Sequence, residues 1–141
     1  MPADFIDSNV FLYLFDEGDD HKRRVAERLI SQALEAGWAS ISFQVVQETL
    51  NVLTRKLATP ATPADARRFL DHVLAPLWRV MPSLALYQRG LAIQARYRYG
   101  FYDALIIAAA MEAGCTRLYS EDLQHSQRIE GLTIENPFLG S

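Results

Sequence analysis

The sequence predicts an α/β protein built on a central parallel sheet. Short apolar segments with strand character alternate with longer segments whose apolar residues recur at helical spacing. Strands that alternate with helices form parallel sheets covered on both faces, with right-handed crossovers. Acidic residues follow several of the strands, and the carboxyl ends of parallel strands meet at one edge of a sheet, where ligands bind. We therefore expect an acidic site at that edge.

Composition restricts the class of protein. Half of the 141 residues are hydrophobic and 22% are charged, as in globular proteins, so we expect residues 1–141 to form a single domain. No apolar run reaches the roughly 18 residues of a membrane span and no signal segment opens the chain, so we expect a cytoplasmic protein without membrane association. Cys115 is the only cysteine, and we expect it in the core. The net charge of −3 gives no overall attraction to nucleic acid, and the basic cluster at 22–24 suits a solvated helix face.

The chain begins with a strand that ends in a carboxylate. Residues 4–7 form a short apolar strand that stops at Asp7. Ser8 and Asn9 supply turn or capping chemistry before the apolar run at 10–15. Burying a carboxylate directly after apolar residues is costly without a partner. Asp7 is therefore the strongest functional candidate.

A helix, a strand and a second helix follow. Apolar residues at helical spacing over 25–34 predict a helix that Gly37 stops. Residues 38–42 fit a second strand. Ser42 suits the N-cap of the next helix, whose apolar residues run over 45–57.

The middle of the chain predicts two more helices around a strand. Residues 62–65 combine a capping threonine, a proline at the first helical position and an acid at the third, so a helix begins there and ends at Pro76. Residues 78–81 alternate like a short strand. The helix over 84–95 is closed by Gly100.

The last third contains the most apolar helix. Residues 100–114 are apolar on almost every face, so this helix should be buried, with Asp103 just before its amino end. A strand over 115–120 follows, and Asp122 lies just beyond it. Residues 132–135 form the last strand.

Four carboxylates should therefore gather at one sheet edge. Asp7, Asp103 and Asp122 lie where strands end or helices begin, and Glu48 lies about a turn and a half inside a helix that leaves the same edge. Two like charges about 4 Å apart repel by about 4 kcal/mol at an effective dielectric near 20, so a cation must offset them. The three histidines lack metal-ligand spacing. All-oxygen ligation selects Mg²⁺ or Mn²⁺, and two such ions can support phosphodiester hydrolysis.

These residues also have purely structural interpretations. Asp103 can be a helix cap that opposes the macrodipole, and Asp122 an ordinary turn residue beside an exposed Glu121. Glu48 can be a surface residue paired with a lysine or arginine. The polar residues Asn9 and Ser120 either orient the acids as hydrogen-bond donors or cap turns.

The order and spacing of these residues resemble PIN-domain ribonucleases, and more narrowly the toxin subunits of VapBC-type toxin–antitoxin pairs. The matching segments are Phe5–Val10, Glu48, Tyr102–Ala110, Ser120–Gln124 and Asn136–Phe138. The resemblance implies a PIN-like three-layer α/β/α sandwich with a central parallel sheet. It also implies an endoribonuclease, dependent on Mg²⁺ or Mn²⁺, that hydrolyses RNA phosphodiester bonds. By matching position it assigns catalysis and metal binding to Asp7, Glu48, Asp103 and Asp122, with Asn9 and Ser120 in support.

The resemblance further implies three partners, namely an RNA substrate, a cognate antitoxin and a second copy of the chain. The run at 10–15 and the helix over 45–57 either form a groove for an antitoxin helix or belong to the core. Ser126 stands where relatives often have glycine, which concerns the shape of a loop.

Two rival functions are weaker. A non-catalytic PIN fold that binds RNA or serves as a scaffold would leave four repelling acids without an offset. In a phosphatase with Asp7 as nucleophile, a second aspartate should stand where the chain has Asn9. The sequence therefore predicts a metal-dependent endoribonuclease that acts as a toxin.

Overall fold

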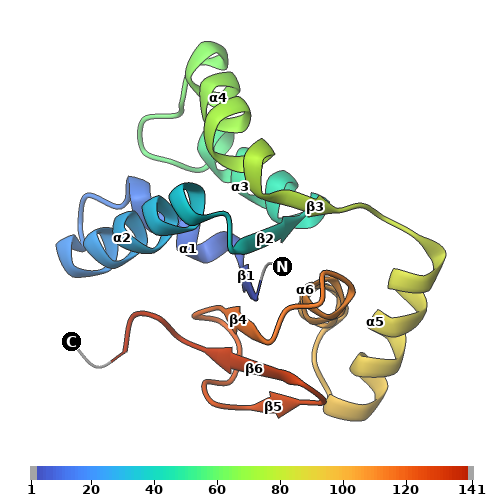
Figure 1. Ribbon diagram of the computed structural model, residues 1–141. Helices are drawn as coiled ribbons and strands as arrows, with labels where there is room; N and C mark the ends of the chain where they lie inside the picture. Colours follow the sequence, from blue (N-terminus) through green and yellow to red (C-terminus); the bar gives the residue numbers. More distant parts are fainter. Residues whose placement is uncertain (1–2, 140–141) are drawn as a thin grey trace.

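The computed structural model describes residues 3–139 and contains a six-stranded sheet in the order β3-β2-β1-β4-β6-β5 (Figure 1). Every neighbouring pair is parallel except β5 and β6, which are antiparallel. The strands are β1 (Asp4–Ile6), β2 (Ala39–Ser42), β3 (Trp78–Val80), β4 (Arg117–Tyr119), β5 (Arg128–Ile129) and β6 (Leu132–Glu135). The predicted α/β fold with a central parallel sheet is confirmed.

Helices cover both faces of this sheet. The α-helices are α1 (Ser8–Leu12), α2 (Asp20–Ala36), α3 (Phe43–Arg55), α4 (Pro63–Phe69), α5 (Leu84–Tyr97) and α6 (Phe101–Glu112). Helix α1 continues into a 3-10 helix, η1 (Tyr13–Phe15). Helix α4 continues into a π-helix, η2 (Leu70–Leu74), and then a 3-10 helix, η3 (Ala75–Leu77). In Figure 1, α6 lies against one side of the sheet with α5 outside it, and α1 and α2 lie on the other side. This arrangement is the three-layer sandwich.

The core is centred on α6, as its sequence predicts. Every residue from Ala104 to Ala110 is buried. Cys115 is also buried, and burial raises the pKa of its thiol to about 12, which suits a core residue rather than a nucleophile. No helix in the span 3–139 is long and apolar enough to cross a bilayer.

The predicted helix caps occur where a side chain bonds to the backbone of a residue close to it in the sequence. Ser42 caps α3 by accepting a hydrogen bond from the backbone N–H of Val45 at 3.4 Å, and Thr62 caps α4 through Asp65 N–H at 3.1 Å. Gly37 ends α2 in the left-handed conformation, with φ 70°. These three predictions are confirmed.

Other helix ends differ from the prediction. Asp7 rather than Ser8 or Asn9 caps α1. The residue that closes α5 is Arg98, with φ 62°, and Gly100 is instead the N-cap of α6. The chain stays helical past Pro76 because this proline lies at the start of η3, where a missing N–H costs no hydrogen bond.

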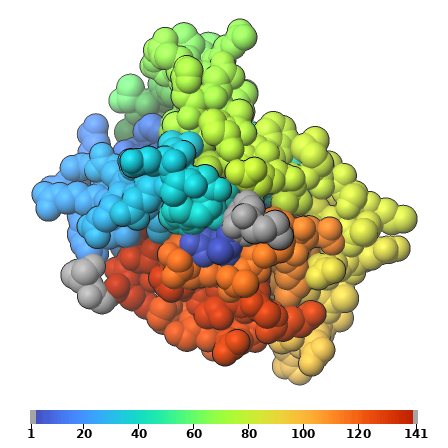
Figure 2. Space-filling model, viewed as in Figure 1, coloured from blue at the N-terminus to red at the C-terminus, as the bar shows by residue number. Residues whose placement is uncertain are grey.

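The carboxyl-terminal region contains a strand that the sequence analysis missed. Two residues of β5 are too few to show alternation, and they pair with β6 through a hairpin. Ser126, just before this hairpin, has φ 71°, a left-handed conformation that glycine adopts more readily. Figure 2 shows the orange and red segments that contain β4 to β6 beside the blue segment of α2, with the segment of α4 projecting above.

Candidate active site

Asp7 lies at the buried centre of the acidic edge, because β1 runs between β2 and β4 and ends one residue earlier. Only 5% of Asp7 is exposed. Its Oδ1 accepts a hydrogen bond from Ser8 N–H and its Oδ2 one from Ser120 Oγ, each at 2.7 Å. Burial raises the pKa of Asp7 to about 7; the two hydrogen bonds oppose this rise, and the charges of Glu48 and Asp122 add to it.

Glu48 faces the same centre from α3. Its Oε1 accepts a hydrogen bond from Ser8 Oγ at 3.0 Å, and its Oε2 accepts one from Gln44 Nε2 at 3.3 Å. Ser8 Oγ also lies 3.4 Å from Asp7 Oδ1, so one hydroxyl links two acids. Within residues 3–139 no ion pair includes Glu48, and its interpretation as a surface residue paired with a base is wrong.

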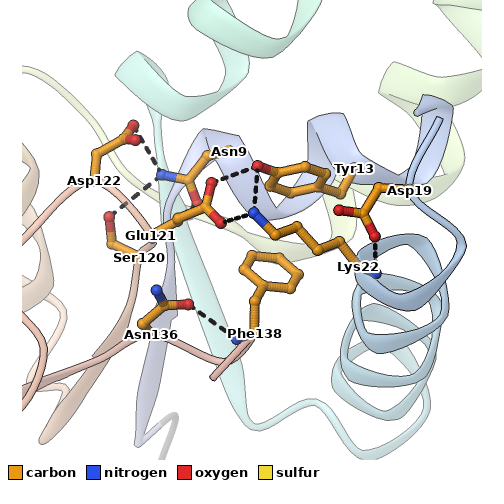
Figure 3. Close-up of polar contacts among 9 residues, drawn as sticks. All are labelled: Asn9, Tyr13, Asp19, Lys22, Ser120, Glu121, Asp122, Asn136 and Phe138. Atoms are coloured by element: carbon orange, nitrogen blue, oxygen red, sulfur yellow. Dashed lines mark hydrogen bonds and ion pairs between the residues drawn. The ribbon is translucent and has the colours of Figure 1, made fainter. Parts of the chain in front are cut away.

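Asn9 joins the ends of β1 and β4. Its Nδ2 donates to Asp122 Oδ2 at 3.1 Å and to Ser120 Oγ at 3.3 Å (Figure 3). The same nitrogen lies 3.5 Å from Asp7 Oδ2. Its Oδ1 accepts a hydrogen bond from Glu121 N–H at 3.2 Å. Asn9 and Ser120 therefore contact the acids directly rather than capping local turns.

Asp103 is the fourth acid and lies in the first turn of α6 rather than before it. Gly100 occupies the N-cap, so Asp103 is not the helix cap. Partial burial raises the pKa of Asp103, and the charge of Asp122 raises it further. Asp122 itself is exposed beyond β4. The fold thus brings the four acids to one edge. Three of them are linked through hydrogen bonds from Ser8 and Asn9, and the fourth, Asp103, is close enough to Asp122 for the charge of Asp122 to raise its pKa.

A family model described as PIN domain matches residues 5–130, a span that includes all four acids. The chain belongs to the PIN domain family. The family resemblance of the sequence is thereby confirmed across most of its length.

Solved structures share this PIN fold. A toxin–antitoxin complex from Klebsiella pneumoniae is 22% identical with a TM-score of 0.67, and the match covers 96% of this chain and 98% of that one. A sarcin-ricin-loop-cleaving VapC toxin of Mycobacterium tuberculosis is 22% identical with a TM-score of 0.61, covering 85% and 90%. DNA-bound VapBC of Salmonella typhimurium is 20% identical with a TM-score of 0.67, covering 97% and 99%. No curated protein sequence matches the chain.

The four carboxylates of the site, which we call the PIN acids, fit a hard divalent cation; they are Asp7, Glu48, Asp103 and Asp122. All four side chains offer carboxylate oxygens, the ligands that Mg²⁺ and Mn²⁺ prefer. In the part of the chain that the structure describes, no group of three or more His, Cys, Asp or Glu side chains is already arranged to hold a metal ion. Asp7, Glu48 and Asp122 are instead linked through Ser8 and Asn9. A cation would relieve the mutual repulsion that contributes to the raised pKa of Asp7.

Sequence analysis missed a second polar cluster beside the PIN acids. Glu121 is half-buried rather than exposed, and its carboxylate accepts hydrogen bonds from Tyr13 and Lys22 (Figure 3). Lys22 Nζ lies 4.9 Å from the centre of the Tyr13 ring and 5.8 Å from that of Phe138. Figure 3 shows Glu121 pointing toward Lys22 while Asp122 points away from it. Lys22 and Glu121 are 99 positions apart in the sequence, so no local sequence pattern predicted their contact.

The hollows around the edge are unequal. One of about 240 Å³ includes Asp122 in its lining, as the only one of the four acids, together with Asn9, Tyr13 and Glu121. A larger one of about 970 Å³ lies between α2 and the strands β4 and β6, and none of the four acids lines it. There, Asp4 is bound by Arg117 through contacts of 3.0 and 2.9 Å. We therefore assign the candidate active site to the smaller hollow, because its lining includes Asp122.

Proposed function

We propose that this PIN domain is a metal-dependent endoribonuclease that hydrolyses RNA phosphodiester bonds and acts as the toxin of a toxin–antitoxin pair. The observation that carries this proposal is the environment of Asp7. Its carboxylate is buried with Glu48 and Asp122 close enough to raise its pKa, an arrangement that a bound cation would stabilise. The proposal is supported by the similarity to a Klebsiella pneumoniae toxin–antitoxin complex and to a sarcin-ricin-loop-cleaving toxin. The predicted cytoplasmic location is part of it.

The acids would hold one or two Mg²⁺ or Mn²⁺ ions. When bound, such ions lower the pKa of a water molecule and stabilise the leaving oxygen of a phosphodiester. Ser8 and Ser120 hold the two oxygens of Asp7 in place. Asn9 holds Asp122, and Ser8 holds Glu48, which in this proposal ligates an ion or orients the attacking water. Asp103 completes the set from α6. In this proposal, hydrogen bonds within the protein hold together carboxylates whose like charges repel one another.

An antitoxin segment is the proposed partner. Beside η1, a hollow of about 400 Å³ is lined by apolar side chains and by a net acidic set of charges, namely Leu12, Phe15, Leu57, Asp16, Glu17 and Lys56. An apolar segment that carries basic residues complements such a lining. The buried residues Val10, Phe11, Val45 and Val46 belong to the core. We therefore limit the proposed antitoxin groove to the exposed end of the region that the sequence suggested.

A second copy of the chain is proposed to cover α5. Leu84 and Leu91 of this helix are 75% and 54% exposed, and they lie on one face with the exposed Tyr87. Met81, just before α5, is exposed too. Contiguous exposed apolar side chains of this kind are typical of protein interfaces.

The decisive experiment is RNA cleavage by the purified protein with Mg²⁺ or Mn²⁺ and with EDTA, run beside Asp7→Asn and Asp103→Asn. We expect cleavage that chelation and either substitution abolish. Metal binding by titration is measured in parallel. Absence of cleavage would overturn the nuclease proposal, and absence of metal binding as well would favour a scaffold role.

A further inference from the structure

Gln44 contacts the elements that carry two of the four acids. It lies in the first turn of α3 and is 4% exposed. Its Nε2 donates to Glu48 Oε2 at 3.3 Å and to the backbone carbonyl of Tyr102 at 3.0 Å. Tyr102 directly precedes Asp103 in α6. One amide group therefore joins the helix of Glu48 to the helix of Asp103.

The orientation of this amide follows from its neighbours. A carboxylate and a carbonyl both accept hydrogen bonds, so the NH₂ group of Gln44 must face them. The opposite orientation would place an amide oxygen against two acceptors. In the resulting orientation Gln44 Oε1 is buried and has no hydrogen-bond partner within residues 3–139. A buried, unpaired acceptor costs stability.

A stability role does not explain such a residue. An apolar side chain of similar size would fill the site without leaving an unpaired oxygen. What it could not do is hold the second oxygen of Glu48, whose first oxygen is held by Ser8. With one donor on each oxygen, rotation of the Glu48 carboxylate is restrained.

We propose that Gln44 is a positioning residue that fixes the Glu48 carboxylate relative to the Asp103 end of α6. This inference rests on the proposed metal-dependent function, because its consequence is a Glu48 carboxylate whose orientation is fixed before a divalent cation binds. Gln44 itself contributes no ligand, and it acts through Glu48.

The test compares Gln44→Leu with Gln47→Leu in the full chain. Gln47 lies in the same helix and is exposed, so its replacement controls for changes in the helix itself. Mn²⁺ affinity is measured by calorimetry, and thermal unfolding is measured in EDTA. We expect Gln44→Leu to weaken Mn²⁺ affinity about tenfold, as removal of groups that orient metal ligands does, while its unfolding temperature stays equal or rises. Gln47→Leu should match the wild type in both.

A second variant shows whether the effect passes through Glu48. On a Glu48→Gln background, Gln44→Leu should weaken Mn²⁺ affinity less than about twofold further, because residues that act through one another are not additive. Unchanged affinity in Gln44→Leu, a matching loss of thermal stability, or full additivity with Glu48→Gln would overturn the positioning role. A wild-type protein that binds Mn²⁺ without cleaving RNA overturns the nuclease proposal alone, and one that binds no Mn²⁺ overturns both.

Discussion

Asn9 donates a hydrogen bond to Asp122 at 3.1 Å across 113 positions of sequence. The same amide contacts Ser120, whose hydroxyl donates to Asp7, so a single asparagine couples the central strand to the turn after β4. Its position at the start of α1 makes the contact possible, because α1 begins directly where β1 ends. The geometry of the acids therefore depends on a neutral residue.

Replacing Asn9 with alanine should release Asp122. We expect Mn²⁺ affinity to fall at least about tenfold. The free energy of unfolding should fall by about 1 kcal/mol for the lost hydrogen bonds. Calorimetry and urea unfolding provide the measurements. Asn51→Ala, an exposed position of α3, is the matched control, and an Asn9 variant that behaves like it would disprove the coupling.

Asp7→Asn should stabilise the metal-free protein at neutral pH. The pKa of Asp7 is raised by burial from 3.8 to about 7, so the folded state disfavours the charged carboxylate. The penalty is absent below pH 3.8, grows as the pH rises, and is complete above about pH 7. At 1.36 kcal/mol per pKa unit the gain at pH 8 is at most about 4 kcal/mol.

Thermal unfolding in EDTA between pH 5 and 8 checks this dependence. The advantage of Asp7→Asn should shrink toward pH 5, and added Mn²⁺ should stabilise the wild type but not the variant, because ligands stabilise the state that binds them. Asp71→Asn removes an exposed carboxylate from η2 and should show neither effect. A gain in stability that is independent of pH would contradict the assignment to Asp7 ionisation.

Adjacent carboxylates at 121 and 122 should behave differently. Glu121 is bound by Lys22 and Tyr13 on the side away from the acids, whereas Asp122 is hydrogen-bonded to Asn9. We expect Glu121→Gln to leave Mn²⁺ affinity within about twofold, and Asp122→Asn to weaken it at least about tenfold.

Lys22→Met should reduce the free energy of unfolding by about 1 kcal/mol, because the ion pair with Glu121 is only partly screened by solvent. Urea unfolding measures the loss. The double variant Lys22→Met with Glu121→Gln should lose less than the sum of the single variants. Arg24→Met, on the exposed surface of the same helix, is the control; equal effects at positions 22 and 24 would rule out a specific pair.

Either Leu84→Glu or Leu91→Glu should dissociate the proposed dimer. Light scattering after size-exclusion chromatography should report a dimeric wild type and monomeric variants, since a charge buried in an apolar interface is costly. Leu139→Glu changes an exposed leucine outside α5 and should leave the mass unchanged. A wild type that is monomeric at high concentration would refute the interface.

Most of the fold was predictable because its signals are local. Helical spacing, the caps Ser42 and Thr62, and the stop at Gly37 each depend on neighbours within one helical turn. Prediction failed where the local signal was ambiguous. Glycine suits both the end of one helix and the N-cap of the next, and the structure uses Gly100 for the second.

By itself, the sequence determined the alternation of strands and helices and the carboxylates at their junctions, and hence the edge of the sheet where acids meet. Which polar groups hold those acids depends on contacts between elements that are far apart in the sequence. The contact of Gln44 with Tyr102 spans 58 positions and that of Lys22 with Glu121 spans 99. Such pairs form because crossovers bring distant helices and turns together, and no periodicity within one segment records that approach.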